Sequence, residues 1–101
     1  MSAISVRAGA VYLPATVVAK YFRGIDAVVV LIRDGRLMIL PVHQATAGGC
    51  LLKLRNAAGD RVALARDVFQ DAGLADLEAE GLNAGWDSEA GALCVPLPGN
   101  M

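Results

Sequence analysis

The sequence predicts an α+β domain in which antiparallel β-hairpins form an open sheet or a small, partly closed barrel, accompanied by two short helices. Two observations support this fold class. Apolar runs separated by glycine-containing turns recur along the chain, which is typical of hairpins. Two short amphipathic stretches end at glycines, which is typical of helices. At 101 residues the chain has the length of a single domain, residues 1–101, and can bury one core without disulfides or metal.

The most strongly patterned element is the hairpin over residues 27–42, AVVVLIRDGRLMILPV. Its first strand is rich in β-branched residues, and a short run of this kind predicts a strand that is covered on both faces. The dipeptide Asp34-Gly35 indicates a type I′ turn, because both central positions of that turn need a positive φ angle. Residues 36–42 then return as the second strand, in which Pro41 has to lie near the end or at an edge.

Two helices are predicted, over residues 14–22 and 65–72. Each has apolar residues at helical spacing, and Phe69 is expected to point inward from the second helix. Gly24 and Gly73 follow the two stretches, and glycine is the favoured residue just beyond a helix end.

The remaining strands are less sharply marked. We expect strands over residues 4–7, 50–55, 61–64 and 92–97, with residues 11–13 continuing or pairing with the first. Residues 74–80 fit a helix or a strand, whereas Leu82, Ala84 and Trp86 alternate as in a strand. The predicted core contains Val29, Leu31, Leu37, Ile39, Leu52, Leu54 and Phe69.

The composition is 55% hydrophobic, which argues against disorder and suggests that some apolar surface is hidden in a partner. Cys50 and Cys94 both lie in apolar runs, where a free cysteine behaves as a small hydrophobe. The first ten residues lack the continuous apolar segment of a secretory signal, and no apolar run approaches the length of a membrane span. We therefore expect a soluble, reduced, cytoplasmic protein.

Charge is distributed unevenly along the chain, although the net charge is only −1. Residues 1–45 carry five cations against two acids, and residues 46–101 carry four cations against eight acids. Such asymmetry can mark a binding face for a partner or for nucleic acid. The candidate contacts are the five cations of the first half, Arg7, Lys20, Arg23, Arg33 and Arg36.

Catalytic and cofactor motifs are absent from the sequence. His43 is the single histidine, and the chain has no C-x-x-C, Walker or G-x-G-x-x-G pattern. The histidine and two cysteines cannot supply the four ligands of a structural zinc site. We expect no enzyme activity, metal or cofactor, although His43 and Cys50 flank one loop and could line a small-molecule pocket together with Trp86.

Residues 4–42 run as strand, glycine, Val11-Tyr12-Leu13-Pro14, short helix, strand, Asp34-Gly35 and strand. This order resembles the swapped-hairpin domain of the AbrB and MraZ transcription regulators. The resemblance implies a dimer of interleaved hairpins that binds DNA through basic residues near the first loop. That loop, residues 7–10, carries one cation here, where the family's turn is polar and basic. Residues 43–101 lie outside the resemblance.

Three functions are compatible with these observations. The first is a small, non-catalytic, cytoplasmic accessory or assembly protein that acts through protein–protein contacts, with a homodimer as one form of that contact. The second is an AbrB-like DNA-binding regulator with Arg7, Lys20 and Arg23 on phosphates. The third is a small-molecule-binding barrel. We expect the first, because apolar residues are abundant and a catalytic set is lacking.

Overall fold

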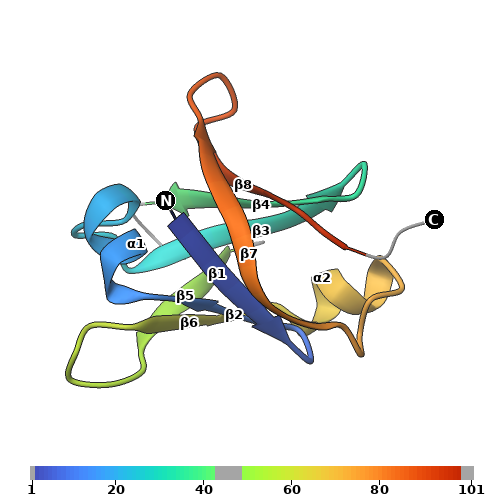
Figure 1. Ribbon diagram of the computed structural model, residues 1–101, viewed down its shortest axis with the longest axis horizontal. Coiled ribbons are helices and arrows are strands. Elements are labelled where there is room, and N and C mark those ends of the chain that lie inside the picture. The colour runs from blue at the N-terminus through green and yellow to red at the C-terminus, as the bar shows by residue number, and fades with distance from the viewer. Residues whose placement is uncertain (1, 43–48, 99–101) are drawn as a thin grey trace.

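Eight strands form a closed antiparallel barrel in the computed structural model of the protein, which describes residues 2–42 and 49–98 (Figure 1). The strands are β1 (Ser2–Arg7), β2 (Ala10–Leu13), β3 (Ala27–Arg33), β4 (Arg36–Val42), β5 (Gly49–Leu54), β6 (Arg61–Leu64), β7 (Glu78–Asp87) and β8 (Ala92–Pro96). Their order around the barrel is β1-β2-β6-β5-β3-β4-β8-β7, and β7 pairs with β1 to close the ring. The predicted antiparallel hairpins with two short helices are confirmed, but the sheet is fully closed.

Closure depends on two strands that each change partner along their length. The first half of β5 pairs with β3 and its second half with β6. The strand β7 pairs with β1 over most of its length and with β8 at its end. A β-bulge between Ile4 and Val6 shifts the β1–β7 register, and Gly81 has a φ of +65° opposite it. A bulge bends its strand and increases twist, which lets the sheet curl onto itself.

The hairpin over residues 27–42 has the predicted turn and pairing. Asp34 and Gly35 have φ angles of +55° and +75°, as a type I′ turn requires. Because this turn has two residues, Arg33 faces Arg36 across the hairpin and Ala27 faces Val42 at its other end.

The same register corrects the predicted core. Leu37 and Ile39 are buried, as are Leu52 and Phe69, so those four predictions are confirmed. Leu37 and Ile39 face Ile32 and Val30, so their side chains share the barrel interior with Val30.

The other three core predictions were wrong. Val29 and Leu31 face Leu40 and Met38 on the outer side of the barrel and are half-buried. The first strand is therefore fully covered on one face only. Leu54 is the last residue of β5 and is 62% exposed. With a two-residue turn, odd-numbered residues of β3 pair with even-numbered residues of β4 and share a face with them. The predicted set took odd-numbered residues from both strands, and these lie on opposite faces of the hairpin.

Two helices pack beside the barrel, α1 (Ala15–Tyr21) before β3 and α2 (Arg66–Asp71) after β6 (Figure 1). They lie one residue or so inside the predicted ranges. The side chains of Val17 and Phe22 pack in the core and anchor α1 and the residue that follows it. The side chain of Phe69 anchors α2 in the same way. Neither helix in the described part of the chain is long enough to cross a membrane.

Gly9, in the turn between β1 and β2, supports the start of α2. It has a φ of +83°, and its carbonyl oxygen accepts a hydrogen bond from the Ala65 N–H at 2.8 Å. A Cβ at this position would lie 2.8 Å from the Cα of Arg66. Only glycine therefore fits the turn against the backbone of α2.

We expect Gly9→Ala to lower the free energy of unfolding by about 3 kcal/mol, since it adds a backbone clash to the strain of a positive φ. Gly24→Ala is the matched control, because Gly24 has a φ of +73° but nothing within 4 Å of the added Cβ. That variant should lose only about 1 kcal/mol. Urea unfolding of both variants measures the difference, and equal losses would contradict the close approach at Gly9.

Asp60 links the β5–β6 turn to the first residue of α1. One carboxylate oxygen accepts a hydrogen bond from the Ala15 N–H at 2.8 Å, and the other accepts one from Asn56 Nδ2 at 3.0 Å. The hydrogen bond from Asn56, followed by that from Ala15, lowers the pKa of Asp60 below its ordinary value of 3.8. A carboxylate with a lowered pKa stabilises the folded state when it is ionised.

The contribution of Asp60 should therefore be complete above the ordinary aspartate pKa and disappear as the pH falls through the lower pKa of the folded state. We expect the difference in melting temperature between the wild type and Asp60→Asn to be largest at pH 5–7 and to shrink as the pH falls below ~4. Thermal unfolding across this range tests the prediction. A difference that does not change with pH would show that the Asp60 charge makes no such contribution.

Candidate functional site

The five cations predicted as contacts lie in three separate places. Arg33 and Arg36 face each other at the turn of the β3–β4 hairpin. Lys20 is in the last turn of α1, and Arg23 lies in the connection between α1 and β3. The seven residues of β3 hold these two groups roughly 20 Å apart, at 3.3 Å per residue. Arg7 ends β1 and lines a different surface.

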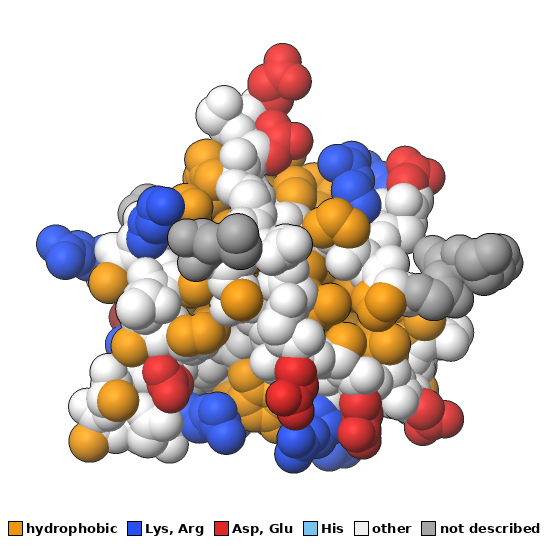
Figure 2. All heavy atoms as spheres, in the orientation of Figure 1, with side chains coloured by type: hydrophobic (Ala, Val, Ile, Leu, Met, Phe, Trp, Pro, Cys, Tyr) orange, Lys and Arg blue, Asp and Glu red, His pale blue; other side chains and the backbone are white. Residues whose placement is uncertain are grey.

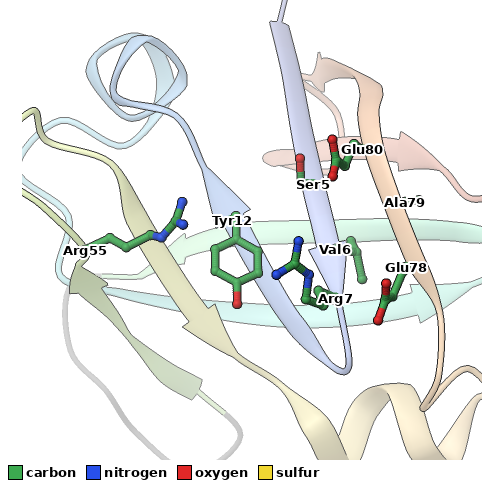
Figure 3. Close-up of a pocket in the computed structure, with 8 residues that line it drawn as sticks. All are labelled: Ser5, Val6, Arg7, Tyr12, Arg55, Glu78, Ala79 and Glu80. Carbon is green, nitrogen blue, oxygen red and sulfur yellow. The ribbon is translucent and has the colours of Figure 1, made fainter.

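Arg7 belongs to a surface hollow of about 380 Å³, which we call the charged groove (Figure 3). Its lining residues come from β1, β2, β7 and the residue after β5: Ser5, Val6, Arg7, Tyr12, Arg55, Glu78, Ala79 and Glu80. Figure 3 shows Arg7 and Arg55 on two sides of Tyr12, while Glu78 and Glu80 extend from β7.

The charged groove can form ionic contacts, but its residues do not form a catalytic set. The guanidinium of Arg55 lies 4.7 Å from the centre of the Tyr12 ring, a cation–π contact that holds Arg55 over the groove. Two arginines oppose two glutamates, so the formal charges of the lining cancel. The lining contains no histidine or cysteine, and thus no group whose ordinary pKa lies near neutral pH.

An aromatic pair lies elsewhere, where α1 meets the end of β7. The rings of Tyr21 and Trp86 stack with centroids 5.5 Å apart and planes 6° from parallel, and Trp86 is 39% exposed. Lys20 Nζ lies 5.3 Å from the Tyr21 ring centre. A hydrogen bond with Ser2, and then the hydrogen bond and charge of Lys20, lower the pKa of Tyr21.

The predicted small-molecule pocket is not assembled as expected. Trp86 is on β7 and Cys50 is on β5, and three strands separate these two in either direction around the barrel. Cys50 instead lines a hollow of about 530 Å³ with Leu64 and the start of α2, and partial burial raises the pKa of its thiol. His43 lies outside the described residues. Grouping Trp86 with Cys50 was therefore wrong, because the two residue types alone say nothing about position around a closed barrel.

The neighbouring strands β6, β5, β3 and β4 present an outward surface that we call the apolar face. Its side chains follow from the register, since they alternate with those buried in the barrel. They are Val29, Leu31, Met38, Leu40, Val42, Leu51, Val62 and Leu64. Leu51 and Leu64 are 53% and 48% exposed, and the pairing of Leu52 with Ala63 places them opposite each other on adjacent strands.

The charges around the apolar face are mainly basic. The four strands contain Arg33, Arg36, Lys53 and Arg61 and no aspartate or glutamate. Asp26 and Asp34 border the strands at turns, and Arg61 Nη1 lies 3.8 Å from Asp26 Oδ1.

On the other side of the barrel, β7 carries three acids and no cation: Glu78, Glu80 and Asp87. Figure 2 views the side of the barrel that carries β1 and β7. Red spheres lie at the β7–β8 turn, and red and blue spheres lie together along the lower edge. The four strands of the apolar face therefore carry only cations, whereas β7 carries only acids.

Sequence reasoning missed both the charged groove and the exposed leucines of the apolar face. The groove brings together positions 5–12, 55 and 78–80, which become neighbours only when β7 closes onto β1. The outward position of Leu51, in contrast, could have been predicted from the sequence. Lys53 has to point outward, so alternation along β5 places Leu52 inside and Leu51 outside.

Fold and surface together define a small closed antiparallel barrel with two packed helices. No family model, curated protein or solved structure matches the chain. The resemblance of residues 4–42 to the AbrB and MraZ domain stays a prediction, since none of these comparisons tests it. Within residues 2–42 and 49–98, no three histidine, cysteine, aspartate or glutamate side chains are grouped to hold a metal ion.

Proposed function

We propose that the protein is a small, non-catalytic accessory or assembly domain that binds another protein through its apolar face. The observation that carries the proposal is the half-exposed pair Leu51 and Leu64, which belongs to the apolar face of four neighbouring strands. Fully burying a leucine side chain contributes about 1.5–3 kcal/mol, so two half-exposed leucines leave a substantial gain for a contact. Soluble monomers seldom expose large continuous apolar patches without such a use.

The other surfaces support binding of a partner less well. The charged groove has an open, charge-balanced lining and one aromatic ring, which favours solvated ionic contacts. The cations expected to contact DNA are divided among three places, whereas a phosphate backbone is bound by a continuous basic surface. The apolar face combines exposed hydrophobic area with a rigid sheet, which is what a central contact region needs.

Capture with the full-length chain as bait tests the proposal. We expect the wild type to retain a protein in stoichiometric amount and Leu51→Asp/Leu64→Asp to lose it, because the two carboxylates would be desolvated in the contact. Leu54→Asp is the matched control, since Leu54 is also an exposed leucine of β5, at 62%, but points to the other side of the strand. Circular dichroism checks that all three chains fold. Retention of the same protein by the double variant would contradict the proposal.

A further inference from the structure

We infer that the surface that docks on the apolar face belongs to a different protein and has an apolar centre bordered by carboxylates. This inference rests on the proposed docking function and specifies the chemistry of the partner. It is carried by the arrangement of the cations at the two ends of the apolar face and by the position of the acids on the barrel.

Arg33 and Arg36 form one end of the apolar face. They are directly opposite each other in the register, and both are exposed. Like charges directly opposite on adjacent strands repel each other. Among the described residues, neither guanidinium has a carboxylate within 4.0 Å. A carboxylate from outside would remove this repulsion and could accept paired hydrogen bonds from a guanidinium.

Lys53 forms the other end. It is exposed, points to the same side as Leu51, and forms no ion pair within the described residues. Arg61, the fourth cation of these strands, is already engaged with Asp26 and donates to the Leu52 carbonyl oxygen at 3.0 Å. The free cations are therefore Lys53 and the arginine pair.

The spacing of the two ends fits the rim of a protein interface. Leu51 pairs with Ala27, so Lys53 lies two residues beyond Ala27, and Arg33 lies six residues from it in the opposite direction. Eight residues at 3.3 Å correspond to roughly 25 Å. A standard interface covers about 800 Å² on each partner, a disc roughly 30 Å across. Cations at this separation lie at the margin of such a disc, with Leu51 between them and nearer to Lys53. This arrangement is compatible with an interface that has an apolar core and a polar rim.

A second copy of the chain fits this surface poorly. In a two-fold symmetric contact the same patch faces itself, so that basic rims would meet basic rims. In a head-to-tail contact, β7 of one copy would lie on the apolar face of the other copy. The acids of β7 would then meet the cations, but the leucines would meet the polar side chains of Glu78, Glu80 and Asn83. Neither arrangement matches apolar centre to apolar centre and opposite charges at the rim.

Selection from a random twelve-residue peptide library displayed on phage, with the full-length chain as target, tests the inference. We expect the enriched peptides to combine large apolar residues with aspartate or glutamate. Leu51→Asp/Leu64→Asp should abolish the enrichment. In the charge-reversed variant Arg36→Glu/Lys53→Glu, the enriched peptides should contain lysine or arginine in place of the acids. Replacing the acids of one synthesised peptide with their amides should weaken its binding at least tenfold by fluorescence anisotropy.

The outcomes separate the inference from the proposed function. Enriched peptides that depend on the leucines but contain no excess of acids would overturn the inference and leave the docking function in place. Enrichment that is unchanged by the leucine double variant, or no enrichment at all, would overturn both. Sedimentation velocity supplies the remaining outcome: a dimer that Leu51→Asp/Leu64→Asp dissociates would identify the occupant as a second copy and overturn the inference of a different, acidic partner.

Discussion

Leu37→Ala is expected to lower the free energy of unfolding by about 3–5 kcal/mol, as other fully buried leucine-to-alanine changes do. Leu37 is fully buried in the barrel and faces Ile32 on β3. The change removes apolar contacts and leaves a cavity that a closed barrel has little freedom to fill. For a domain of about 100 residues, whose stability is typically 5–15 kcal/mol, this is a large fraction of the total.

Leu31→Ala is the matched control, because it is the same substitution on the paired strand. Leu31 is half-buried on the outer side, so its truncation should cost roughly 1 kcal/mol. Urea unfolding of the two variants compares their free energies directly. If Leu31→Ala were the more damaging change, the register that the Asp34-Gly35 turn imposes would be shifted by one residue, since such a shift exchanges the two faces of a strand.

Phe69→Ala is expected to have an effect of similar size, about 3–5 kcal/mol. Phe69 is fully buried, and it is the residue of α2 that reaches the barrel core. Its loss should detach α2 from the barrel as well as leave a cavity, so amide hydrogen exchange in residues 66–71 should become faster.

Val68→Ala is the comparison for Phe69, because Val68 is only partly buried on the same helix. We expect it to lower the stability by about 1 kcal/mol and to leave the exchange of α2 protected. Equal losses from the two substitutions would mean that α2 is not anchored through Phe69. Denaturant unfolding and hydrogen exchange measure the two quantities on the same samples.

Local signals in the sequence were sufficient to predict most strands, helices and turns, but they did not predict that the sheet closes into a barrel. The turn at Asp34-Gly35 is specified by two adjacent residues, and Gly24 and Gly73 mark the ends of both helices. Closure instead depends on β1 meeting β7, whose residues are more than seventy positions apart, and on a bulge at Gly81. Neither feature leaves a local pattern, and residues 74–80 fit a helix as well as a strand until the β1 pairing is known.

The sequence could likewise place contact residues together only where their pairing is local. Arg33 and Arg36 could be placed side by side because the hairpin register is local. Arg7 could not be assigned to the charged groove, since Glu78 and Arg55 reach it from distant parts of the chain. Trp86 was grouped with Cys50 on composition alone, whereas the strand order places them on opposite sides of the barrel.

Methyl NMR of the full-length chain, titrated with an acidic, leucine-containing peptide selected on it, tests the docking role of the apolar face most directly. We predict that the methyl signals of Leu51 and Leu64 shift on binding, while those of Leu54 stay in place. Shifts centred on residues around Tyr12 in the charged groove, or around Trp86 in the aromatic pair, with the leucines of the apolar face unaffected, would contradict that role.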